Sequence, residues 1–114
     1  MATFTKLKLS GSTDGKGIKV VQTETAGTTI HTAHATALDE IYIYAVNSSD
    51  VEEKLTIEWG QADAPDGNIE CLVPSKSGLQ LIIPGLLLTN ELVVKAFSET
   101  ANVVILHGWV NRIT

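Results

Sequence analysis

Cysteine is almost absent from this sequence, which has one, Cys71, among 114 residues. A single cysteine excludes an internal disulfide and a zinc cage built of several thiolates. Basic residues are also few, since 8 Lys and Arg stand against 13 Asp and Glu and give a net charge of −5. Neutralising nucleic-acid phosphates needs clustered Lys and Arg, so we expect no nucleic-acid partner.

Long hydrophobic runs are missing as well. No stretch approaches about 18 consecutive apolar residues, the length that a membrane-spanning helix needs. Residues 1–12 contain no apolar run of signal-peptide length. We therefore expect a soluble chain with no membrane partner. Its 114 residues, 44% of them hydrophobic, suit one folded domain over residues 1–114 with its own core.

Residues that favour β-strands are abundant. The chain contains 13 threonines and many valines and isoleucines, which suit a pleated, half-buried surface. Apolar residues alternate with period two: in the segment 54–59, Leu55, Ile57 and Trp59 share one face of a strand. We expect the opposite, polar face of that segment to be in solvent, as in an antiparallel sheet with one buried face.

Turn residues arrive at nearly regular intervals between the alternating segments. Gly, Pro, Asn, Asp and Ser gather, for example, at 11–17, 61–68 and 84–85. Short strands with such spacing are typical of a β-sandwich. We therefore predict an all-β fold, an antiparallel β-sandwich of the jelly-roll or Ig-like type with eight or nine short strands. The predicted strands lie near 3–10, 17–24, 28–34, 39–47, 53–60, 68–73, 78–83, 91–97 and 102–112.

Two segments are apolar on both faces, and a small sandwich has little mass to cover both sides of a strand. Residues 79–88 contain one polar residue, and residues 103–110 carry two apolar rows. Two explanations stay open: a central strand covered by a loop, or an interface with another subunit or protein. The candidate interface residues are Phe4, Lys6, Lys8, Leu86, Leu87, Leu88, His107 and Trp109.

Residues 1–10 also allow two interpretations. They place Lys6 and Lys8 on one face and precede a glycine-rich segment. They form either the first strand of the sandwich or an extended N-terminal arm that adds to the edge strand of a neighbouring molecule.

No cofactor or metal motif is present. Gly11, Gly15 and Lys16 resemble a Walker A loop, but the spacing is one residue short, and we expect the glycines to serve a turn. His31 and His34 would project to opposite faces of a strand, so we expect no metal site there. His107 lies among apolar residues, and we expect it in the core or an interface with its hydrogen bonds satisfied.

A catalytic set is equally absent from the sequence. The carboxylates lie in or beside turns, no G-x-S-x-G elbow occurs, and Cys71 falls on the apolar face of its strand, where burial raises a thiol pKa. We therefore predict a protein that is not an enzyme. Trp59 is expected as a core anchor and Trp109 as a core or interface residue. An exposed aromatic such as Trp59 or Tyr44 would instead indicate sugar binding.

Four stretches together resemble the small structural proteins of tailed bacteriophages that decorate or cement capsids. They are residues 9–33, 39–60, 74–90 and 101–113. The resemblance implies a compact β-sandwich, often trimeric, docked on the major capsid protein at the virion surface and made in the bacterial host cytoplasm. It supplies no functional residue that can be transferred to a position of this chain.

The leading hypothesis is therefore a non-enzymatic virion structural protein that decorates the outside of a phage capsid and stabilises it. Two alternatives remain open. One is a receptor- or glycan-binding module of a phage head or tail, and the other is a ring-forming tail or connector protein.

Overall fold

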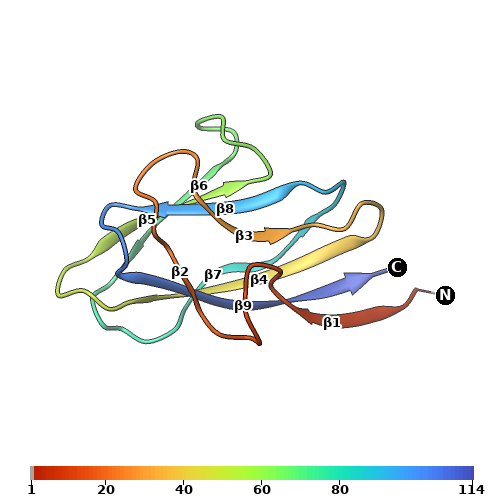
Figure 1. The fold of residues 1–114 in the computed structure, drawn as a ribbon, viewed down its shortest axis with the longest axis horizontal. Helices are drawn as coiled ribbons and strands as arrows, with labels where there is room; N and C mark the ends of the chain where they lie inside the picture. Colours follow the sequence, from red (N-terminus) through yellow and green to blue (C-terminus); the bar gives the residue numbers. More distant parts are fainter. Residues whose placement is uncertain (1) are drawn as a thin grey trace.

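The part of the chain that the structure describes contains nine strands, joined by turns and loops (Figure 1). The computed structural model describes residues 2–114, and these contain no helix and hence no helical segment able to cross a membrane. Two antiparallel sheets pack face to face, so the predicted all-β, antiparallel sandwich is confirmed. The strands are β1 (Phe4–Lys8), β2 (Ile18–Lys19), β3 (Thr28–Thr32), β4 (Leu38–Asn47), β5 (Glu53–Trp59), β6 (Asn68–Val73), β7 (Gln80–Leu88), β8 (Val93–Ser98) and β9 (Val104–Ile113).

The two sheets differ in size. The larger sheet has the order β1-β9-β4-β7, and β2 pairs with β9 beyond the end of β1. The smaller sheet has the order β3-β8-β5-β6. Since β4 runs along the whole of β9, β1 and β2 occupy the same edge of β9 in succession. Figure 1 shows the N- and C-terminal strands side by side at one end of the molecule.

The hydrophobic core lies between the sheets and follows from the period-two pattern. In β4, Ile41, Ile43 and Ala45 point inward and are fully buried, while the residues between them are partly exposed. The other sheet contributes Leu55, Ile57 and Val94, among others. Trp59 packs against this cluster, as expected for a core anchor.

Thr56 and Glu58, on the polar face of β5, are buried, contrary to the expectation that this face lies in solvent; Lys54 on the same face is exposed. Glu58 is 2% exposed and Thr56 is 1% exposed. The segment 22–27 crosses from β2 to the smaller sheet, where Thr25 Oγ1 and Gly27 N donate hydrogen bonds of 2.9 Å and 2.6 Å to the Glu58 carboxylate. The same crossing explains why the strand predicted at 17–24 has only two residues.

The predicted turn at Pro84–Gly85 is also wrong, because β7 continues through it to Leu88. β7 is the edge strand of its sheet, and proline is tolerated there since its missing N–H removes no inner ladder bond. Gly85 has a φ of +97° and lies at a register shift between Ile41 and Tyr42 of the neighbouring strand. A β-bulge of this kind favours glycine, which accepts positive φ without strain.

Residues Phe4–Lys8 pair with β9 of the same chain rather than extending away from it. Backbone hydrogen bonds of 2.8 Å and 2.9 Å join Thr3 and Thr114 at the end of this pairing. Leu9, which follows β1, is almost fully buried in the core. Within this chain, the N-terminal segment is thus an edge strand of the larger sheet.

Candidate functional site

The surface of the larger sheet that points away from the core, here called the outer face, collects aromatic, aliphatic and basic side chains from five strands. Strand register aligns Lys8 with Trp109, Trp109 with Tyr42, and Tyr42 with Pro84. Residues that the register aligns in this way have their side chains on the same face of the sheet. The outer face consists of Phe4, Lys6, Lys8, Lys19, Leu38, Glu40, Tyr42, Tyr44, Val46, Leu81, Pro84, Leu87, Ile105, His107, Trp109, Asn111 and Ile113.

A four-membered stack crosses the middle of the outer face. The rings of Tyr42 and Trp109 lie nearly parallel, with centroids 4.1 Å apart and an interplanar angle of 12°. The Lys6 ammonium lies 4.7 Å from the Trp109 ring centroid, a cation–π contact from a diagonal neighbour on β1. Next to Tyr42 is Gly85, where a Cβ atom would come within 2.9 Å of the phenol ring.

This stack holds the aromatic rings in one orientation. Trp109 has Lys6 and Tyr42 against it, and Tyr42 also lies against Gly85. Sugar binding by aromatic residues needs an open ring face, and here the faces are engaged within the sheet. Trp109 and Tyr42 therefore leave little open ring face for stacking on a sugar.

Glu40 is the one acidic side chain of the outer face. Its Oε1 accepts a hydrogen bond of 3.3 Å from Asn111 Nδ2, across the β4–β9 pair. Burial, together with the neighbouring Glu40 carboxylate, raises the pKa of Tyr42 above its usual value. Tyr42 is consequently an uncharged phenol at neutral pH.

The β7 side of the outer face is apolar and open. Leu81 and Leu87 are both 50% exposed, and Leu86, at the bulge beside Gly85, is also exposed. At the opposite corner, the register places Phe4 in one row with Ile113 and Leu38, and Phe4 is 64% exposed. Folding of this chain therefore leaves apolar side chains of β1, β4 and β7 in solvent.

Most of the predicted interface residues meet on this outer face. Leu88 is a correction, because its side chain turns inward, is 8% exposed and packs in the core. Leu86 pairs with the buried residue Ile41 at the bulge and is exposed beside the outer face. His107 is half-buried on the outer face, where Gly17 lies against its imidazole ring. The expectation that the hydrogen bonds of His107 are satisfied stays a prediction. The residues that the structure places on the outer face are Phe4, Lys6, Lys8, Leu87, His107 and Trp109.

Tyr42 and Lys19 belong to the outer face but were not among the predicted residues. Tyr42 could have been predicted from the sequence. The alternation over residues 41–44 places two tyrosines on the face of the strand that points away from the buried isoleucines. Lys19 had no comparable signal, because only the pairing of β2 with β9 brings it to this surface.

A buried charged cluster joins the two sheets near the chain termini. Asp39, which is fully buried, receives hydrogen bonds of 2.7 Å and 3.0 Å from Arg112 and one of 2.8 Å from His31 Nε2. His31 Nδ1 accepts the backbone N–H of Ser10, so the ring proton sits on Nε2. The cluster satisfies its own polar groups and has a structural role.

Burial raises the pKa of Asp39, but the hydrogen bonds from Arg112 and His31 and the charge of Arg112 outweigh it. The pKa of Asp39 is therefore held below its ordinary value of 3.8. A carboxylate that is ionised and fully bonded in this way has no proton to give and no free position for a substrate.

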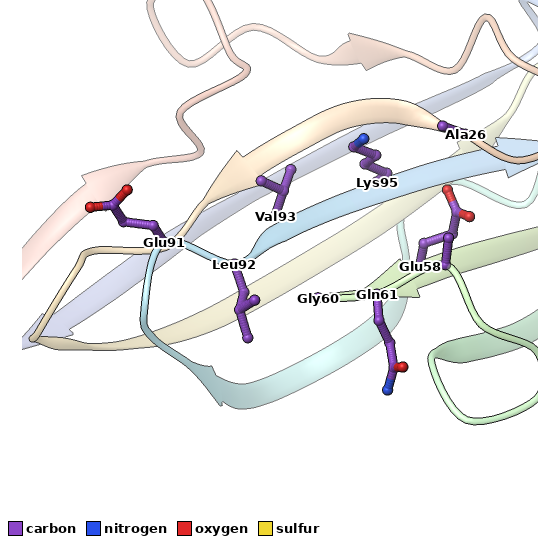
Figure 2. Close-up of a pocket in the computed structure, with 9 residues that line it drawn as sticks. Ala26, Glu58, Gly60, Gln61, Glu91, Leu92, Val93 and Lys95 are labelled. Carbon is purple, nitrogen blue, oxygen red and sulfur yellow. The ribbon is translucent and has the colours of Figure 1, made fainter.

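A cavity of about 230 Å³ lies over the outer surface of the smaller sheet (Figure 2). Val93 and Lys95 rise into it from β8, and Glu58 borders it from β5. Both carboxylate oxygens of Glu58 are already bonded to the segment 22–27. The cavity is below the usual 300–1,000 Å³ of ligand pockets, so we assign it no ligand.

The remaining nucleophile is unreactive. Burial raises the pKa of Cys71 to about 11, in agreement with the expectation for its strand face. Its Sγ lies 3.6 Å from the Leu55 carbonyl oxygen. Within the described residues, no group of three or more His, Cys, Asp and Glu is arranged to hold a metal ion.

Comparisons with known protein families, with curated proteins and with solved structures find no match to this chain. The outer face is therefore the feature on which a functional assignment rests.

Proposed function

We propose that this protein is a non-enzymatic structural protein of a phage virion, which decorates the outside of the capsid and stabilises it. The outer face is the observation that carries the proposal. It combines exposed leucines with a stack of side chains whose orientation is already set. Such a surface loses little side-chain freedom when it is covered by another protein.

Burial of apolar area supplies the driving force. Covering a few hundred Å² of apolar surface at about 25 cal/mol per Å² contributes several kcal/mol per copy, before association costs are subtracted. Leu81 and Leu87 contribute much of this apolar surface because half of each side chain is exposed. Many copies on a shell multiply a contact that is modest for each one.

The proposal includes the major capsid protein as partner and the virion surface as location, with assembly in the bacterial host cytoplasm. It also includes a homo-oligomer, with a trimer favoured by the resemblance to phage decoration proteins. The mass of the purified protein in solution, measured by light scattering, tests the oligomer separately from capsid binding.

The test compares virion shells that lack this protein with shells to which it has been added back. Addition of the wild type is expected to raise the temperature at which the shells break. The double variant Leu81→Ser/Leu87→Ser is expected to bind weakly and to protect little, because it removes apolar side chains from the outer face.

The matched control is Leu72→Ser, which alters a leucine of similar exposure on β6 of the smaller sheet. It is expected to protect as well as the wild type. Equal survival of bare and decorated shells would reject the stabilising role, and equal loss in the control would reject the outer face as the docking surface.

A further inference from the structure

The charged residues of the outer face are not evenly distributed. Lys6 and Lys8 on β1 and Lys19 on β2 follow one edge of β9, and all three are exposed. Opposite them, at the β7 edge, residues 79–88 contain no charged side chain. One edge of the docking surface is therefore cationic and the other is apolar.

The three lysines have no acidic partner in the part of the chain that the structure describes. The lysine ion pairs in residues 2–114 involve Lys54 with Glu70 and Lys76 with Asp50, both away from the outer face. The face itself holds a single glutamate, Glu40, near its centre. The face is thus positive although the whole chain carries a net charge of −5.

We propose that the outer face docks in one orientation, with its β1–β2 edge against a carboxylate-rich part of the capsid surface and its β7 edge against an apolar part. This inference rests on the proposed function, since it describes the partner of the same surface. Charge complementarity favours this partner, because three unpaired lysines attract carboxylates and repel a basic surface.

Negative charge elsewhere on the chain also favours docking through the outer face over other orientations. An acidic capsid surface repels Asp63 and Asp66 in the loop before β6, and it attracts Lys6, Lys8 and Lys19. Wrong orientations are disfavoured by like charges, and the correct one forms faster through electrostatic steering.

The test uses shells of the virion from which this protein has been removed and measures binding by co-sedimentation. The variant is Lys8→Glu/Lys19→Glu, which leaves Lys6 on Trp109 intact. The control is Lys54→Glu/Lys76→Glu, which changes the net charge by the same amount at exposed positions outside the outer face. Circular dichroism of both variants checks that they fold.

We expect Lys8→Glu/Lys19→Glu to weaken shell binding by about tenfold or more at an ionic strength near 0.1 M, where surface charges still interact over about 10 Å. The control is expected to stay within about threefold of the wild type. Wild-type binding should fall as salt is added, and the salt dependence should be smaller for the lysine variant.

Equal binding by the two variants overturns this inference and leaves the proposed function in place. No binding by the wild type overturns the proposed function and the inference together. Charge reversal at Lys8 and Lys19 could instead dissociate a homo-oligomer and leave shell binding unchanged. The β1–β2 edge would then bind a second copy of this chain, and the inference would be overturned.

Discussion

Asp39 on β4 and His31 on β3 join the two sheets through a hydrogen bond of 2.8 Å between two almost fully buried side chains. Arg112 closes the cluster from β9, and Ser10 contacts His31 from the segment after β1. Four separate parts of the chain are thereby held together at one end of the sandwich.

Replacing Asp39 should be strongly destabilising. Asp39→Asn keeps the shape of the side chain but leaves the Arg112 charge without its partner, which typically lowers the free energy of unfolding by about 3 kcal/mol. Urea denaturation measures the loss. Asp50→Asn, which breaks the exposed pair with Lys76, is the control and should cost less than about 1 kcal/mol. Similar losses in both variants would contradict a special role for the buried cluster.

The stability contributed by Asp39 should depend on pH in the acid range. Its pKa is lower in the folded protein than its ordinary value of 3.8. The contribution is therefore complete above pH 3.8 and is lost as the pH falls below 3.8 and through the folded pKa. We expect the difference in free energy of unfolding between the wild type and Asp39→Asn to shrink on acidification. A difference that stays constant down to the acid limit would contradict this assignment.

Gly85 should resist substitution more than another glycine of similar backbone conformation. Gly85→Ala adds a Cβ within 2.9 Å of the Tyr42 ring and also strains a φ of +97°. We expect a loss of about 2 kcal/mol, from backbone strain and from displacement of the ring. Gly78→Ala, where φ is +77° and no atom lies within 4 Å, should cost only the strain, about 1 kcal/mol. Equal losses at the two positions would show that the Tyr42 ring moves away from the added Cβ atom at little cost in free energy.

The same substitution should lower the free energy of unfolding much more at Leu88 than at its neighbour Leu87. Leu88→Ser puts a hydroxyl into the core and removes buried methyl groups, which should cost about 3 kcal/mol. Leu87→Ser alters a half-exposed side chain and should change the free energy of unfolding by about 0.5 kcal/mol or less. Thermal unfolding of the two variants checks the assignment of their faces. A large loss for Leu87→Ser would mean that the outer face is needed for folding itself.

Much of the fold could be predicted from the sequence. Each of the nine predicted strand regions overlaps an observed strand, because alternation and turn residues act over a few neighbouring positions. The apolar excess of residues 79–88 also indicated a surface that one sandwich does not cover. The predictions failed where a distant segment intervened, as at Glu58 under the segment 22–27, and at Pro84, where an edge strand tolerates proline.

The sequence by itself thus determined the strands, the class of fold and the presence of surplus apolar side chains. Only the tertiary structure decided which of these side chains lie together. Lys6, Trp109, Tyr42 and Gly85 come from four strands, and Arg112 reaches Asp39 across 73 positions of the chain. The reason is physical: a strand depends on local backbone and side-chain preferences, whereas its neighbours and register depend on the packing of the whole molecule.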